Sequence, residues 1–200
     1  MSQSKYRQLQ LEATWALTNI ASGTTNQTQC VIDKGGIPLF IKLLSDSNPG
    51  IAEQAVWAIG NISGDCVFYR DTILKSGGLE PLVRLIQNTT DKVMIKQGAW
   101  ALSNLCRGSP LPKYEFVKSA VATICQVVKL GIIDDKEILA DCCWALSYLT
   151  EGQKSKIQRV VETGVIPSIV KISTEYSSAV VIPAVRILGN VVTGNELQTD

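Results

Sequence analysis

The chain has 200 residues, 46% of them hydrophobic, so it is long enough to bury a substantial core. Its 19 basic and 18 acidic side chains leave a formal net charge of +1, which provides no field for attracting nucleic acid or an anionic membrane surface. No apolar run approaches the roughly 18 residues that span a bilayer, and the polar start MSQSKYRQLQ is not typical of a secretory signal. We therefore expect no nucleic-acid partner and no membrane segment.

A repeat runs through the whole sequence. Trp15, Trp57, Trp100 and Trp144 are spaced 42, 43 and 44 residues apart, and another 42 residues lead to Arg186. The strings around these positions align without gaps as EATWALTNI, QAVWAIGNI, QGAWALSNL, DCCWALSYL and PAVRILGNV. A second phrase recurs between them as GGIPLFIKLL, GGLEPLVRLI, SAVATICQVV and TGVIPSIVKI. This period lies in the armadillo/HEAT range of stacked helical repeats.

In chain order, the pattern predicts a partial repeat (1–23), four full repeats (24–65, 66–108, 109–152 and 153–194) and the start of another (195–200). Each full repeat is predicted to hold three helices. A short helix, for example Thr28 to Lys34, is followed by one that begins near a proline such as Pro38, Pro81 or Pro167. The third carries the tryptophan position and ends at a glycine. The phrase SAVATICQVV lacks the glycine pair and the proline, so an irregular start is expected for the 109–152 repeat. Such units bury their apolar faces only by stacking into a solenoid.

Each third helix is predicted to bury one stripe of side chains. At 100° per residue, positions −2, +2 and +5 from the tryptophan position share one face. That face holds only small or apolar residues: Ala13, Leu17, Ile20; Ala55, Ile59, Ile62; Gly98, Leu102, Leu105; Cys142, Leu146, Leu149; and Ala184, Leu188, Val191.

A second stripe, at positions −3, 0 and +4, lies about 140° away by the same counting. It holds Glu12, Trp15, Asn19; Gln54, Trp57, Asn61; Gln97, Trp100, Asn104; Asp141, Trp144, Tyr148; and Pro183, Arg186, Asn190. Core packing is the usual role of a periodic tryptophan, but it poorly explains indoles flanked by amides and carboxylates on the face away from the core. We interpret this stripe as an exposed binding surface.

The side chains of this surface predict an extended, basic peptide as the ligand. The amides of Asn19, Asn61 and Asn104 can each bond both the C=O and the N–H of a peptide backbone. Indoles attract ammonium groups and hold long aliphatic stems. Carboxylates on or beside the stripe favour lysine or arginine: Glu12, Asp65, Glu137 and Asp141. With repeats about 10 Å apart and an extended chain advancing ~3.3–3.6 Å per residue, each repeat would meet two or three ligand residues.

No residue pattern supports catalysis, a cofactor or a metal. The chain has no histidine, no GxGxxG or GxxxxGK[ST] phosphate loop, and no CxxC pair among its six cysteines. We interpret the cysteines as small apolar residues of a reducing compartment, and we expect no disulfide between the adjacent Cys142 and Cys143. The expected function is binding rather than an enzyme activity.

The strings WALTNIASGTTNQT, EQAVWAIGNISGD, WALSNLCRG, DCCWALSYLTEG and VRILGNVVTGN closely resemble the central armadillo repeats of the importin α (karyopherin α) family, the adaptors of nuclear import. The resemblance covers essentially the whole chain. Tyr148 in place of asparagine, and Arg186 in place of tryptophan with Asn190 retained, match the family's fifth and sixth repeats. It therefore implies a fragment of roughly the second to sixth repeats, a right-handed superhelical all-α solenoid, and shuttling between cytoplasm and nucleus.

The resemblance also implies which residues bind nuclear localisation signals, the basic import peptides of cargo proteins. The major site would comprise Trp15, Asn19, Trp57, Asn61, Trp100 and Asn104. Ser22, Gly23, Thr28 and Asp65 would surround the most demanding lysine. Gln54, Gln97, Arg107, Glu137, Asp141, Trp144 and Tyr148 would contribute further along the groove. Arg186, Asn190 and Val192–Thr193–Gly194 would form one side of a minor site.

Two further expectations follow from the resemblance, and one rival interpretation remains open. Importin β would be recruited in the full-length protein by a basic N-terminal arm that is absent here. Gln97 stands where the family commonly has asparagine, so a local contact would shift. The rival is an armadillo scaffold for acidic or phosphorylated partners, whose groove would be lined with lysine and arginine. Here only Arg107 and Arg186 are basic among the predicted site residues.

Overall fold

The computed structural model describes residues 3–130 and 135–194, and every regular element among them is a helix. The predicted start of a further repeat at 195–200 lies outside the described residues. The chain divides into two compact units, Met1–Leu105 and Cys106–Asp200.

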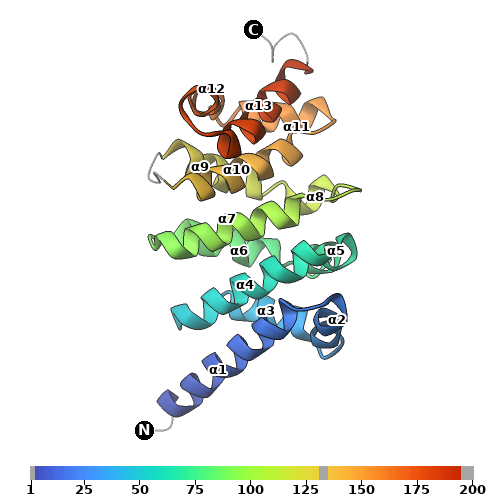
Figure 1. Cartoon of the computed structure of the whole chain (residues 1–200), viewed down its shortest axis with the longest axis vertical. Helices are drawn as coiled ribbons and strands as arrows, with labels where there is room; N and C mark the ends of the chain where they lie inside the picture. The colour runs from blue at the N-terminus through green and yellow to red at the C-terminus, as the bar shows by residue number, and fades with distance from the viewer. Residues whose placement is uncertain (1–2, 131–134, 195–200) are drawn as a thin grey trace. The chain divides into compact units, whose positions relative to one another are not determined.

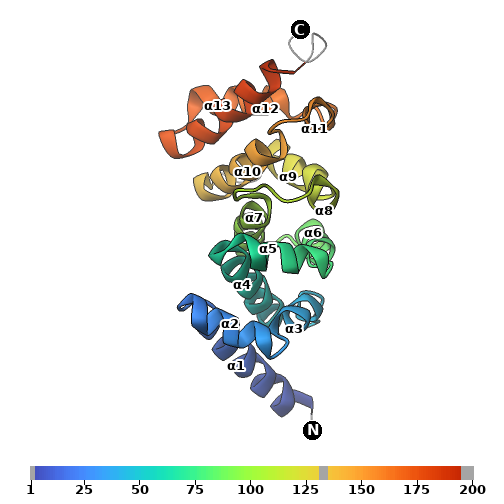
Figure 2. The same cartoon turned by 90° about the vertical axis from the view of Figure 1, so that its right-hand side faces the viewer.

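Three long helices of the first unit carry its tryptophans, and a pair of shorter helices stands between each of them and the next (Figures 1 and 2). This confirms the predicted all-α class with three helices per repeat. The helices are α1 (Gln3–Ala21), α2 (Thr25–Asp33), α3 (Gly36–Leu43), α4 (Pro49–Asp65), α5 (Val67–Lys75), α6 (Leu79–Asn88) and α7 (Lys92–Cys106).

The second unit repeats the pattern less regularly. Its helices are α8 (Tyr114–Val117), α9 (Ala120–Lys129), α10 (Lys136–Leu149), α11 (Lys154–Val161), α12 (Ile166–Glu175) and α13 (Ser178–Val192). Helix α8 is a single turn of four residues. It immediately precedes the phrase that lacks the glycine pair and the proline, where an irregular start was predicted.

Side-chain caps place the helix starts. Helix α2 begins at Thr25, so the predicted start at Thr28 was wrong. Thr24 caps it in a reciprocal capping box with Gln27, whose side-chain oxygen accepts from the Thr24 backbone N–H at 2.8 Å. The predicted glycine end is also wrong for α4, which continues through Gly64 to Asp65.

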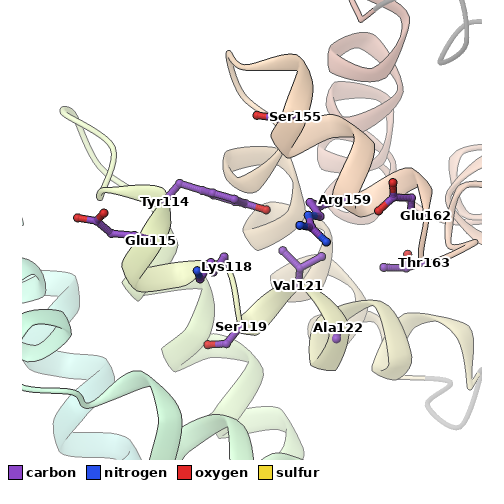
Figure 3. A pocket seen from close by; sticks show the side chains of 10 residues that line it. All are labelled: Tyr114, Glu115, Lys118, Ser119, Val121, Ala122, Ser155, Arg159, Glu162 and Thr163. Atoms are coloured by element: carbon purple, nitrogen blue, oxygen red, sulfur yellow. The ribbon is translucent and has the colours of Figure 1, made fainter.

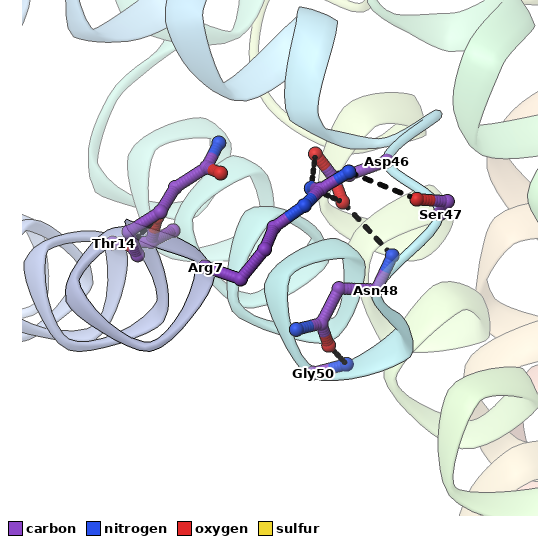
Figure 4. Close-up of polar contacts among 7 residues, drawn as sticks. Arg7, Thr14, Asp46, Ser47, Asn48 and Gly50 are labelled. Atoms are coloured by element: carbon purple, nitrogen blue, oxygen red, sulfur yellow. Dashed lines mark hydrogen bonds and ion pairs between the residues drawn. The ribbon is translucent and has the colours of Figure 1, made fainter. Parts of the chain in front are cut away.

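A polar cluster joins α1 to the start of α4 (Figure 4). The Arg7 guanidinium donates to both Asp46 carboxylate oxygens, at 2.6 and 2.9 Å, and to the Ser47 hydroxyl at 3.1 Å. Asp46 also accepts from the Asn48 backbone N–H at 2.8 Å, and Asn48 caps α4. The ion pair is partly exposed, so its net contribution to stability is small, but it links two neighbouring tryptophan helices.

The predicted buried stripe is confirmed in α4, α7 and α10, where all its members are buried, and largely in α13, where Leu188 is half-buried. It is wrong for α1. Ala13 is exposed and Ile20 is 43% exposed. Helix α1 packs on α2 and α4, and no helix of the described chain precedes it to cover the remaining side.

The six cysteines are free thiols, of which Cys30 is exposed, Cys66 is half-buried and the other four are buried. Burial raises the pKa of the Cys142 thiol well above its usual range and raises the pKa of Cys143 to about 12. Because the thiolate is the reactive form, native protein at pH 7–8 should react with N-ethylmaleimide at the exposed Cys30, while Cys142 and Cys143 stay unmodified until the chain unfolds. Peptide mapping by mass spectrometry measures this, and rapid labelling of Cys143 in the native protein would contradict the described packing.

Candidate peptide-binding surface

The three tryptophans of the first unit come from equivalent positions on packed helices. Trp15 is 51% exposed and Trp57 is 43% exposed, while Trp100 is half-buried. The Thr18 hydroxyl, one turn after Trp15, lies within hydrogen-bonding distance of the Gln54 carbonyl, one turn before Trp57, at 3.1 Å. The first two rings therefore belong to neighbouring turns of adjacent helices and lie outside the core.

The asparagines one turn further on differ in their surroundings. Asn19 is exposed, and the half-buried Asn61 side chain makes no hydrogen bond to the described residues. Asn104 is only 4% exposed because its amide nitrogen donates to the Gly60 carbonyl of α4 at 3.1 Å. The prediction of an exposed amide at each of these positions is therefore wrong for Asn104.

The two glutamines of the stripe each have a buried oxygen that finds no hydrogen-bond partner within 3–130 and 135–194, the Oε1 atoms of Gln54 and Gln97. Gln97 donates its amide nitrogen to the Glu53 carboxylate at 2.9 Å, and that acceptor fixes the orientation of its amide group. Unsatisfied buried acceptors cost about 1–3 kcal/mol each, so both side chains would gain from a donor that reached them. Glu53 was not predicted as a site residue.

The predicted lysine pocket lies where α1 and α4 end and α2 begins. The exposed Asp65 carboxylate accepts from the Thr25 hydroxyl at 3.0 Å, which brings the end of α4 to the start of α2. Ser22 and Gly23 follow the end of α1 and are exposed. The Asp65 carboxylate favours a cation here, and the ends of α1 and α4 add partial negative charge, which the partly positive start of α2 opposes.

Thr28 is a partial exception in this pocket. Its side chain is 1% exposed, and its hydroxyl lies within hydrogen-bonding distance of the Ala21 carbonyl at 3.2 Å and the Thr24 carbonyl at 3.3 Å. Thr28 therefore lies below the exposed residues and holds the end of α1 to α2. Its place among the residues that surround a ligand lysine stays a prediction. Thr25, which contacts Asp65, was not predicted.

The second unit presents a different arrangement. The rings of Trp144 and Tyr148 stack with centroids 6.0 Å apart. The Arg186 guanidinium lies 5.2 Å from the Tyr148 ring centroid and 2.6 Å from the Glu151 carboxylate, a residue that was not predicted. Arg186 thus occupies a ring face that a ligand cation would otherwise use.

The remaining predicted residues of the second unit lie on α10 and α13 or just after the end of a helix. Asn190 donates to the Ser147 carbonyl at 2.9 Å and to the Thr150 hydroxyl at 3.0 Å. Glu137 is exposed in the first turn of α10, and Asp141 is half-buried one turn later. The other predicted residues are the exposed Arg107, Val192 and Thr193 and the half-buried Gly194. Pro183 was predicted to lie on the exposed stripe, but it is buried.

A pocket of about 800 Å³ also lies in the second unit, between α8, α9 and α11 (Figure 3). Its charged lining is mixed, with Glu115 and Glu162 opposite in sign to Lys118 and Arg159. It contains no tryptophan and no asparagine. This pocket therefore offers neither the charge nor the repeated amides of the predicted surface.

No group of three or more cysteine, aspartate or glutamate side chains is placed to hold a metal ion within 3–130 and 135–194. In the same residues, none of the helices combines the length and the apolar character that crossing a membrane requires.

Comparison with known proteins relates the chain to two groups. A family model described as Armadillo/beta-catenin-like repeat matches residues 24–64 and 69–107. Importin subunit alpha-1b of Oryza sativa subsp. japonica is 46% identical over all of this chain, and importin subunit alpha-B of Dictyostelium discoideum is 50% identical over 95% of it. The chain spans 37% of the length of each of these relatives.

Solved structures show the same fold. A designed armadillo repeat protein in complex with the peptide (KR)4 matches 98% of this chain and 81% of its own chain, with a TM-score of 0.81 and 26% identity. Another designed armadillo repeat protein matches 94% of this chain and 78% of its own, with a TM-score of 0.82 and 25% identity. The fold is thus an all-α array of armadillo repeats.

Proposed function

We propose that this chain, which belongs to the importin α family of armadillo-repeat proteins, acts in nuclear import by binding lysine- and arginine-rich nuclear localisation signals in an extended conformation. The observation that carries the proposal is the exposed series of Trp15, Trp57 and Asp65 on packed helices of the first unit. The importin names of the relatives support the adaptor role. Shuttling between cytoplasm and nucleus would follow from it.

The chemistry of the first unit favours a basic ligand. None of its predicted site residues is basic, whereas Glu12, Glu53 and Asp65 lie on or beside the stripe. The indoles of Trp15 and Trp57 offer ring faces to long aliphatic stems that end in a positive charge. The Asn61 amide, which has no hydrogen-bond partner among the residues that the structure describes, is available to a peptide backbone of any sequence. The designed protein of the same fold, solved with (KR)4, supports this class of ligand.

The second unit would contribute less to binding a basic segment. Arg186 is already paired with Glu151 and stacked on Tyr148. A ligand cation would have to displace the Arg186 guanidinium from the Tyr148 ring. We therefore propose that the first unit supplies the main site. The role of Arg186 and Asn190 in a minor site, and recruitment of importin β by an N-terminal arm, remain predictions.

A titration across ligand charge tests the proposal. Isothermal titration calorimetry should show micromolar or tighter binding of a PKKKRKV-type peptide, equivalent to about −8 kcal/mol or better. A peptide of the same length with glutamate at the basic positions should not bind. The affinity of the basic peptide should fall as salt rises, because the charges of this surface are exposed. Preferential binding of the acidic peptide would favour the rival scaffold for acidic partners.

A further inference from the structure

Two predicted peptide-contacting side chains of α7 rest on one residue of α4. A Cβ atom added to Gly60 would lie 2.1 Å from Cζ3 and 2.6 Å from Cε3 of Trp100, so the six-membered ring of the indole lies directly over the glycine. The Gly60 carbonyl accepts the Asn104 amide at 3.1 Å. Both contacts lie within the first unit.

The backbone of α4 gives no other reason for a glycine at this position. Gly60 lies inside a helix of 17 residues, and it is not among the glycines with positive φ. Alanine would favour the helix, because glycine loses more conformational freedom on folding. An alanine does not fit at this position, because its methyl group would overlap the Trp100 ring.

We propose that Gly60 is a positioning residue of the peptide-binding surface, which seats the Trp100 indole against α4 and holds the Asn104 amide through its carbonyl oxygen. Gly60 lies three residues after Trp57 and directly before Asn61. The seated ring therefore borders the surface on which Trp57 and Asn61 would meet the ligand. The effect of Gly60 on peptide binding rests on the proposed function. The seating of the Trp100 ring against Gly60 does not depend on it.

The chain contains a matched control for this substitution. Gly189 of α13 holds the same place in its repeat, three residues after Arg186 and directly before Asn190. A Cβ added there meets no atom of the described part of the chain within 4 Å. Gly189→Ala therefore makes the same change in helix propensity as Gly60→Ala, without displacing a ring.

Binding affinity provides the first readout. Gly60→Ala should bind the PKKKRKV-type peptide about tenfold more weakly than the wild-type chain, as expected when an aromatic anchor is misplaced, while Gly189→Ala binds unchanged. In a Trp100→Ala background, Gly60→Ala should add little, because both changes act through the same ring. Full additivity, or wild-type affinity of Gly60→Ala, would overturn the positioning role.

The position of the ring is a second readout that requires no ligand. In a chain with Trp15, Trp57 and Trp144 replaced by phenylalanine, Trp100 is the only tryptophan. Gly60→Ala should shift its fluorescence to longer wavelength and increase quenching by acrylamide, and Gly189→Ala should do neither. Unchanged quenching would show that Gly60 does not seat the ring. Absence of peptide binding by the wild-type chain would overturn the proposed function, whereas the quenching result would still decide the seating.

Discussion

Replacement of Asp65 by lysine is expected to weaken binding of a PKKKRKV-type peptide by about 100-fold or more, in the range found when a partner of a close charge pair is lost or reversed. The exposed Asp65 carboxylate supplies the negative charge of the predicted lysine pocket, and it accepts a hydrogen bond from the Thr25 hydroxyl. A lysine there would repel the ligand ammonium. Isothermal titration calorimetry at fixed ionic strength measures the change.

The control for this experiment makes the same charge change elsewhere in the first unit. Glu80 is exposed in the first turn of α6 and belongs to none of the predicted site residues. Glu80→Lys should retain wild-type affinity within about twofold, because distant exposed charges are screened by salt. If Asp65→Lys and Glu80→Lys bound equally well, the main lysine would lie elsewhere.

Truncation of two indoles is the second change with a large expected effect. The Trp57→Ala, Trp100→Ala double variant should bind the basic peptide about 100-fold more weakly or not measurably, since tryptophans are the commonest anchors of interfaces. Its circular dichroism spectrum should remain helical. Trp57 is 43% exposed whereas Trp100 is more buried, so most of the loss in stability should come from Trp100, at about 1–3 kcal/mol for partial burial.

Phe68 provides the comparison for that variant. It is an aromatic side chain of the first unit, 66% exposed on α5, and outside the predicted site. Phe68→Ala should leave peptide affinity unchanged, which separates loss of a specific ring from general loss of exposed aromatic surface. Unfolding of the double variant would mean that the indoles belong to the core, and unchanged binding would remove them from the site.

The repeat made the fold predictable from the sequence. The local departures from the repeat were not predictable in the same way. Tryptophan spacing and helix phase predicted three-helix repeats and the buried face of α4, α7 and α10. The same helix phase wrongly predicted that Ile20 of α1 is buried, because burial of that side chain depends on whether a neighbouring helix covers it. The start of α2 was misplaced because the capping box of Thr24 and Gln27 was overlooked.

The sequence predicted which residues share a face of the tryptophan helices, but not the contacts that these residues make with one another. Helix phase distinguishes faces, yet it does not show that Asn104 turns its amide towards the Gly60 carbonyl or that Glu151 pairs with Arg186. These contacts join residues 44 and 35 positions apart. Because the repeat is regular, a comparison of equivalent positions in successive repeats could have indicated which residues contact one another across neighbouring helices. Gly60 stands where Ser103 and Ser147 occur in the following repeats.

A crystal structure of the chain bound to a PKKKRKV-type peptide tests the central claim most directly. We expect an extended peptide across α1, α4 and α7, with lysine stems against Trp57 and Trp100, backbone groups bonded to Asn61, and one ammonium within hydrogen-bonding distance of Asp65. A peptide seated instead in the pocket between α8, α9 and α11, with the indoles of the first unit left uncovered, would contradict it.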